Sequence, residues 1–162
     1  MKIYTKTGDM FTTSTIKDRV SKDDLIIECL GTIDEASSAI MLAANFVQKA
    51  DVKEILIELV KDMFDLSGDV LKVKDTPLVN HDKVSRLETW IDYYQERLPE
   101  IHGFILPGTT IASSHIHVAR TVVRRLERRL VKYGKNNNLY FESFQYINRL
   151  SDLLFVLARY ME

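Results

Sequence analysis

The sequence predicts an all-α protein, an up-and-down five-helix bundle, on three observations. Apolar residues recur at three- and four-residue steps through five long segments, which is the period of amphipathic helices. Short or medium connections join these segments, and the chain shows little strand signal. Because every such helix must bury its apolar stripe, a helical bundle is the stable arrangement for these elements.

The 162 residues fit one domain, and neither a Pro/Gly-rich linker nor an internal repeat divides them. We therefore expect a single domain over residues 1–162. Residues 1–22 show no sustained helical period but are rich in threonine and basic side chains. Hydroxyls, basic groups and the backbone N–H groups near Gly8 are the materials of a phosphate cradle. The alternative is a flexible or strand-like lead-in, since the segment contains no P-loop spacing.

The first helix is predicted to begin at Asp23 or Asp24, either of which can cap it. Asp34 and Glu35 fall in its middle, beside the apolar face. That face consists of Ile26, Leu30, Ile33, Ser37, Ile40, Ala44 and Val47. The second helix is predicted to open with Asp51 as its cap and to break at residues 75–77, where Pro77 cannot continue it.

The third helix is predicted to start near Asn80 and to end at Pro99. The loop that follows, EIHGFILPGTT, places Phe104, Ile105 and Leu106 in succession. Three consecutive apolar side chains in a loop need burial, either in the core of their own chain or against a bound partner. Core packing is the commoner of these two explanations.

The fourth helix is predicted from about Thr110 to Tyr133, stopped by Gly134 and the polar run KNNN, and the fifth from about Ser143 to residue 162. On the fourth helix one apolar face comprises Ile116, Ala119, Val123, Leu126 and Leu130. The adjacent flank carries Ser113, His117, Arg120, Arg124, Glu127 and Arg128.

Three arginines on that flank, Arg120, Arg124 and Arg128, lie one helical turn apart, and Arg125 and Arg129 lie nearby. Such a row repels itself unless an anion lies against it. The anion is either a carboxylate from a neighbouring element or a polyphosphate; the remaining alternative is a solvated cationic face.

Composition narrows the functional classes. The net charge is −1, so the arginine row is a local cluster and the chain is not a general nucleic-acid binder. The single Cys29 excludes an internal disulfide and suits a cytoplasmic location. The four histidines show no convincing metal-ligand spacing, and we expect no protein-borne metal site. No apolar run approaches a membrane span, and the first residues lack the apolar segment of a signal peptide.

Several separated segments together resemble one family, the PduO-type ATP:cob(I)alamin adenosyltransferases. The segments are IYTKTGD at 3–9 with TTS at 12–14, RVSK at 19–22, GTIDE at 31–35, FILPG at 104–108, HVARTVVRRLER at 117–128 and YINRLSDLLFVLAR at 146–159. They occur in the family's order and at similar spacing across essentially the whole chain. Each motif alone is moderately specific, and the ordered set is highly specific.

The resemblance implies a ferritin-like, cobalamin adenosyltransferase-like bundle, preceded by an irregular ATP-binding segment over residues 1–22. It also implies a homotrimer with active sites between adjacent subunits. The reaction would transfer the 5′-deoxyadenosyl group of ATP to the cobalt of a reduced corrinoid, cob(I)alamin, and release triphosphate. ATP and the corrinoid would be substrates, with Mg²⁺ accompanying ATP. A flavoprotein reductase or a cobalamin-dependent acceptor enzyme is a candidate partner; nucleic acid and membrane are not.

The resemblance also assigns residues. Arg120, Arg124, Glu127 and Asn148 would line the nucleotide site, and Asp34 would pair with Arg120 across the subunit interface. Phe104 would sit against the corrin and exclude its lower axial ligand. The ATP-binding segment would contribute Thr5, Lys6, Thr7, Gly8, Asp9, Arg19 and Lys22.

Two loops, the N-terminal one and the one that contains Gly108, depart from the family pattern. Phe11 stands where the family usually has glycine, Ile16 and Lys17 replace a glycine pair, and Thr109 replaces a second glycine after Gly108. Because glycine permits positive φ and close approach to phosphate, these changes could weaken ATP binding or turnover. Two rival functions therefore stay open: a non-catalytic carrier or sensor of ATP or adenosylcobalamin, and a helical module whose arginines dock an acidic partner or RNA.

Overall fold

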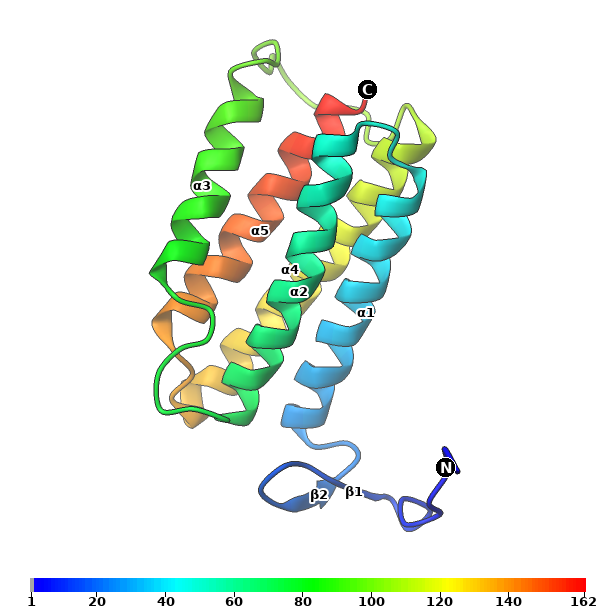
Figure 1. The fold of residues 1–162 in the computed structure, drawn as a ribbon, viewed down its shortest axis with the longest axis vertical. Helices are drawn as coiled ribbons and strands as arrows, with labels where there is room; N and C mark the ends of the chain where they lie inside the picture. The colour runs from blue at the N-terminus through cyan, green and yellow to red at the C-terminus, as the bar shows by residue number, and fades with distance from the viewer. Residues whose placement is uncertain (1) are drawn as a thin grey trace.

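The computed structural model describes residues 2–162 and has five helices, as the sequence predicts (Figure 1). The helices are α1 (Leu25–Phe46), α2 (Ala50–Leu71), α3 (His81–Gln95), α4 (Ile111–Asn137) and α5 (Phe141–Tyr160). They run up and down in an antiparallel bundle, in which α1 packs on α2 and α4, and α5 packs on α3 and α4. None of these helices combines the length and apolarity that crossing a membrane requires.

The apolar stripes of the helices meet in one continuous core. The predicted apolar face of α4 is buried throughout, and Ile33, Ile40 and Ala44 of α1 are buried as well. Tyr146 of α5 is the largest fully buried side chain. The helical period therefore identified the core-facing residues correctly.

Two short strands precede the bundle, β1 (Thr12–Ser14) and β2 (Arg19–Ser21). They pair antiparallel, with Thr13 opposite Val20. The strand-like alternative for the lead-in is therefore confirmed for these residues. The hairpin lies at the end of the bundle where α1 begins, and the connection from α3 to α4 crosses the opposite end (Figure 1).

The helix starts follow the capping residues in part. The Asp24 carboxylate accepts from the Ile26 N–H at 3.0 Å, and the Asn80 side chain caps α3 by accepting from the Lys83 N–H at 3.2 Å. The prediction that Asp51 caps α2 is wrong, because α2 already begins at Ala50. The Asp51 carboxylate accepts instead from the Tyr94 hydroxyl at 2.7 Å, which joins α2 to α3.

Several predicted helix boundaries differ from the structure. Helix α2 ends at Leu71, four residues before the predicted break at residues 75–77. Helix α3 ends at Gln95, four residues before Pro99. Helix α4 continues past Gly134 to Asn137, and Asn138 ends it with φ of 49°. Gly134 serves close packing, since a Cβ there would lie 2.3 Å from Cζ of Phe144. Helix α5 begins at Phe141, two residues before the predicted start.

A buried ionic cluster fixes α3 against its neighbours. The Asp62 carboxylate on α2 is fully buried and accepts from Lys83 and Arg86 of α3 and, at 2.8 Å, from the Tyr146 hydroxyl of α5. A buried carboxylate is stable only when paired and hydrogen-bonded in this way. The cluster thereby sets the position of α3 beside α5, where α3 forms one wall of a pocket.

Candidate functional site

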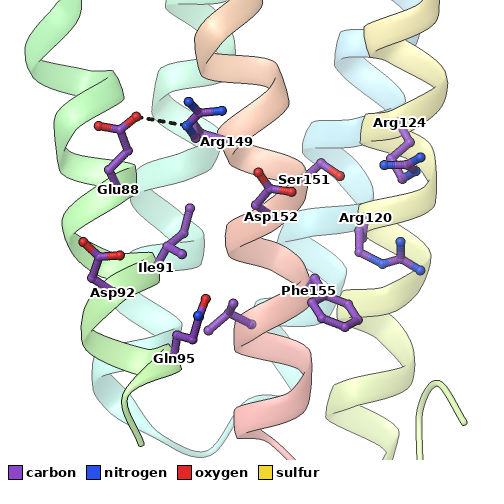
Figure 2. Close-up of a pocket in the computed structure, with 11 residues that line it drawn as sticks. Glu88, Ile91, Asp92, Gln95, Arg120, Arg124, Arg149, Ser151, Asp152 and Phe155 are labelled. Carbon is purple, nitrogen blue, oxygen red and sulfur yellow. Dashed lines mark hydrogen bonds and ion pairs between the residues drawn. The ribbon is translucent and has the colours of Figure 1, made fainter. Parts of the chain in front are cut away.

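The arginines of α4 face a pocket of about 480 Å³ between α3, α4 and α5. Figure 2 shows Arg120 and Arg124 on α4, beside Phe155, Ser151 and Asp152 of α5. The far wall is α3, which contributes Glu88, Ile91, Asp92 and Gln95. The pocket therefore combines a cationic side on α4 with an acidic side on α3.

The five clustered arginines of α4 have different partners. Arg125 pairs with Glu35, and Arg129 with Glu28, both on α1. For these two arginines the anion that the sequence required is a carboxylate of a neighbouring helix. Arg120, Arg124 and Arg128 form no ion pair with any residue from 2 to 162, and Arg128 donates only to the backbone carbonyl of Arg124, at 2.9 Å. Of these three, Arg120 and Arg124 line the pocket and are available there for an external anion.

Arg120 is held in place by its neighbours on α4 and α5. Its Nε–H donates to Nδ1 of His117 at 3.3 Å, and its guanidinium carbon lies 5.8 Å from the ring centroid of Phe155. Partial burial and the adjacent Arg124 guanidinium both lower the pKa of Arg120. An anion beside Arg120 would therefore stabilise the charged form of its guanidinium group.

Glu127 and Asn148 connect α4 to α5 next to the arginines. The Asn148 side-chain NH₂ donates to Oε1 of Glu127 at 3.2 Å, and Arg149 donates to the side-chain oxygen Oδ1 of Asn148 at 2.8 Å. The structure brings Glu127 and Asn148 together, as their shared assignment to one site requires. Arg149 pairs with Glu88 at 2.9 Å, and Asp152 forms no ion pair with any residue from 2 to 162. Burial raises the pKa of the Asp152 carboxyl.

In the N-terminal segment the predicted phosphate-binding residues lie together around Arg19. The Arg19 guanidinium donates to the carbonyl of Thr7 and, at 2.8 Å, to the hydroxyl of Thr12. A Cβ at Gly8 would lie 3.2 Å from Nζ of Lys22, so this lysine folds over the glycine. Two cations therefore flank the turn that contains Gly8, which is the charge arrangement a phosphate needs.

The other predicted residues of this segment lie close by. The Thr5 and Thr7 hydroxyls are 2.8 Å apart and share a hydrogen bond. The Asp9 N–H donates to the Lys6 carbonyl at 3.4 Å, which closes the turn over Gly8. Lys6 has φ of 61°, in the left-handed region.

Within one chain the two halves of the predicted site do not meet. The hairpin lies beyond the N-terminal end of α1 (Figure 1), whereas Arg120 and Arg124 lie in the middle part of α4. Asp34 is exposed on α1 and forms no ion pair with any residue from 2 to 162. The sequence-predicted residues thus form two separate groups on one chain.

Phe104 lies on the connection between α3 and α4 and is fully exposed, at 111% of its reference area. Leu106 is also exposed, at 78%, and only Ile105 is half-buried. The explanation that these residues fill their own core is therefore wrong for Phe104 and Leu106. Two exposed apolar side chains on one short loop favour the other explanation, contact with a bound partner.

Sequence reasoning missed Phe155 as a site residue. It lies one turn from Asp152 and two turns from Asn148 on the polar flank of α5, and it lines the same pocket as Arg120 and Arg124. An aromatic residue inside an otherwise polar stripe was the signal that could have identified it. The buried position of His117, which is only 6% exposed, was equally unforeseen.

The described residues contain no group of three or more His, Cys, Asp or Glu side chains arranged to hold a metal ion. This does not conflict with Mg²⁺ brought by a nucleotide, because Mg²⁺ keeps several waters and binds through phosphates and one or two carboxylates. Asp9 is the carboxylate nearest to Gly8 in the sequence and could fill that role.

Comparison with known proteins supports a common origin for the whole arrangement. The family model described as cobalamin adenosyltransferase matches residues 3–161. A corrinoid adenosyltransferase from Bacillus subtilis is 42% identical over 98% of this chain and 86% of its own length. A cobalamin adenosyltransferase from Cupriavidus metallidurans is 41% identical over the same shares.

Solved structures agree. A variant PduO-type ATP:corrinoid adenosyltransferase from Lactobacillus reuteri, complexed with cobalamin and ATP, superposes with a TM-score of 0.92 at 32% identity. The match covers 98% of this chain and 90% of that one. A second variant of the Lactobacillus reuteri enzyme, complexed with ATP, gives a TM-score of 0.91 at 31% identity, covering 98% and 93%. By sequence and by fold, the chain belongs to the cobalamin adenosyltransferase family.

Proposed function

We propose that this protein transfers the 5′-deoxyadenosyl group of ATP to the cobalt of a reduced corrinoid and releases triphosphate. The observation that carries the proposal is the pair Arg120 and Arg124, which share a pocket wall and lack a carboxylate partner among residues 2–162. The neighbouring Arg125 and Arg129 are neutralised, so the unpaired charge is confined to one face. Membership in the family supplies the reaction that such a pair would serve.

The reaction requires no proton transfer by the protein. The electron pair of cobalt(I) attacks C5′ of ATP, a cobalt–carbon bond forms, and the C5′–O5′ bond breaks with its electrons leaving on triphosphate. Cobalt is thereby oxidised from +1 to +3, and no general base is needed. The protein must hold C5′ in line with cobalt and stabilise the charge that develops on the leaving group.

Arg120 and Arg124 suit the second of these tasks. Two guanidinium groups one turn apart can hold a polyphosphate through paired hydrogen bonds. Lysines would contact the same polyphosphate only as point charges. Glu127 and Asn148, already joined at 3.2 Å, would bind the nucleoside end through their remaining polar atoms. Phe104 would lie against the corrin and, by displacing the lower axial ligand, ease the formation of cobalt(I).

A second copy of the chain would complete the site. The segment before α1 lies at the end of the bundle where that helix begins (Figure 1), and no hydrogen bond or ion pair joins its described residues to Arg120 or Arg124 of the same chain. This segment carries Thr5, Lys6, Thr7, Gly8, Asp9, Arg19 and Lys22. The family resemblance implies that the assembly is a homotrimer, and we infer that each N-terminal segment in it binds the phosphates and Mg²⁺ at a neighbour's α4. The exposed Asp34 would pair with Arg120 across that interface. We place the enzyme in the cytoplasm, where its single buried thiol stays reduced.

The test is an anaerobic assay with purified protein, MgATP and cob(I)alamin generated by a chemical reductant, followed by the spectral change to adenosylcobalamin. Turnover with release of triphosphate is the expected result, and a chemical reductant removes the need for a flavoprotein reductase. If no adenosylcobalamin forms in the presence of both substrates, the proposal is rejected.

The second candidate is a carrier or sensor, and the observation that raises it is the conformation of Phe11. Phe11 adopts φ of 61°, a left-handed value that costs a non-glycine residue roughly 1–2 kcal/mol. A phosphate loop under this strain could bind ATP without aligning it for reaction. Tight ATP binding by calorimetry without turnover would select the carrier. Salt-sensitive RNA binding that ATP does not compete would instead select a docking module.

A further inference from the structure

The residues that end α5 hold the loop that carries Phe104. On one side of Phe104, the Arg159 guanidinium donates to the Pro99 carbonyl at 2.6 Å. On the other side, the Thr110 hydroxyl donates to the Met161 carbonyl at 2.9 Å. Both ends of the connection are thus tied to one turn of chain. The position of the exposed Phe104 ring depends on these ties.

Glu162 adds a third tie. Its carboxylate oxygen Oε1 accepts from the Gly108 N–H at 3.3 Å and from the Ser113 hydroxyl at 2.9 Å. Its side chain is only 20% exposed, so these hydrogen bonds are partly shielded from water. Gly108 has φ of +81°, and a Cβ there would lie 2.5 Å from Oγ of Ser114. The loop is therefore seated tightly against the first turn of α4, with Glu162 between them.

The same carboxylate lies next to His117. Nε2 of His117 is 4.0 Å from Oε1 of Glu162, is buried, and has no hydrogen-bond partner in the described chain. Nδ1 of the ring accepts from the Arg120 Nε–H at 3.3 Å, so the neutral ring carries its proton on Nε2. Burial and the charge of Arg120 lower the pKa of His117, which keeps the ring neutral, while Glu162 acts in the opposite direction.

We propose that Glu162 and His117 are positioning residues that connect the Phe104 loop to Arg120. The inference rests on the proposed function, since it joins the corrinoid side of the reaction to the nucleotide side. A shift of about 1 Å would bring the unpaired Nε2–H within hydrogen-bond distance of Glu162. The chain Glu162–His117–Arg120 would then be continuous, and the loop and the guanidinium would be set together. Neither residue touches the reacting atoms.

The first test needs no substrate. Hydrogen exchange of the loop amides is compared in the wild type, Glu162→Ala, Glu162→Gln and the control Glu100→Ala, whose side chain is 91% exposed on the same loop. We expect Glu162→Ala to speed exchange across residues 103–110 by roughly fivefold, because two hydrogen bonds are lost. Glu162→Gln keeps a side-chain oxygen acceptor and should stay close to the wild type. Unchanged exchange in Glu162→Ala would overturn the role of Glu162.

The second test separates the two substrates in the steady state. Glu162→Ala should raise the KM for the corrinoid by roughly fivefold, the size expected for lost hydrogen bonds to a charged group, with a smaller change in kcat. His117→Leu should raise the KM for ATP, and His117→Asn should restore it, since the Asn carbonyl can accept from Arg120. His115→Leu is the control on the same helix, where that ring stacks on Phe46 at 4.4 Å.

The double variant Glu162→Ala with His117→Leu decides whether the two residues act as a unit. Effects on kcat/KM that fall well short of additive would support the connection, and fully additive effects would overturn it. A wild type without turnover would reject the proposed function, whereas active variants with unchanged KM values would reject only the positioning roles. Because Glu162 lies at the surface, its variants keep the inference testable even if His117→Leu does not fold.

Discussion

Replacing Arg124 by alanine tests the central assignment, because stability and activity should respond in opposite ways. Arg124 is exposed and forms no ion pair with residues 2–162, so its loss breaks no charge pair within the chain. Its charge lowers the pKa of Arg120, one turn away. Since like charges at this spacing destabilise a helix by about 0.2–0.5 kcal/mol, Arg124→Ala should leave the free energy of unfolding unchanged or slightly raised.

Activity should fall much further. Removing one preformed donor from developing negative charge typically costs about 10²–10³ in rate, equivalent to roughly 3–4 kcal/mol. We expect a loss of that size in kcat/KM for Arg124→Ala. The kcat/KM of Arg124→Lys should lie between those of the wild type and Arg124→Ala, because lysine keeps the charge but not the paired hydrogen bonds.

The matched control is the adjacent Arg125→Ala. Arg125 and its partner Glu35 are 40% and 50% exposed, and a surface pair of this kind contributes at most about 1 kcal/mol. We expect a small loss of stability in urea denaturation and full activity in the anaerobic assay. Full activity in a folded Arg124→Ala protein, or an equal loss in Arg125→Ala, would refute the assignment.

Three further predictions concern other parts of the chain. Phe11→Gly should tighten ATP binding by up to about fivefold in calorimetry, because glycine accepts φ of 61° without strain; weaker binding would show that the ring itself contributes. Asp62→Asn should lower the free energy of unfolding in urea by about 3–5 kcal/mol, since it uncouples a fully buried carboxylate from its cations, whereas the half-exposed Asp65→Asn should cost about 1 kcal/mol or less. Burial raises the pKa of the Cys29 thiol from 9.0 to about 11, so the folded state holds its proton more tightly and stability should fall as the pH rises from 9 toward 11. Urea midpoints of Cys29→Ala should fall less over this range, and identical slopes would contradict the shift.

The sequence was sufficient for the fold because burial in a helical bundle follows a simple period. The stripe on α4 from Ile116 to Leu130 is buried as predicted. The cap Asp24 and the start of α3 near Asn80 are confirmed. The errors arose where tertiary contacts outweighed local preference. Glycine commonly follows the last residue of a helix, which is why the sequence predicted a stop at Gly134. In the structure Gly134 instead leaves room for the Phe144 ring, and the helix continues to Asn137.

Only the part of the site that lies on a single helix, α4, could be predicted from the sequence. The spacing of Arg120 and Arg124 predicted an anionic partner, but the sequence could not show that Arg125 and Arg129 already have theirs on α1. That distinction depends on how α1 and α4 are placed relative to each other, which no local pattern records. The same holds for Glu162, whose role depends on a loop 54 residues away in the chain. Phe155 was different, since its place on a polar stripe was visible in the sequence.

The altered N-terminal loop can be judged from its backbone. Of the four positions where the family usually has glycine, only Phe11 adopts a positive φ; Ile16, Lys17 and Thr109 have φ values that any residue accepts. Glycine was therefore not needed for backbone conformation at three of the four positions. At the fourth, the loop keeps a left-handed turn at a cost of about 1–2 kcal/mol. That turn still lets the Phe11 carbonyl accept from the Lys22 N–H at 2.9 Å, and the cations around Gly8 stay in place. Because Lys22 and Arg19 flank Gly8 despite the strain at Phe11, we favour an enzyme over a carrier that has lost its phosphate loop.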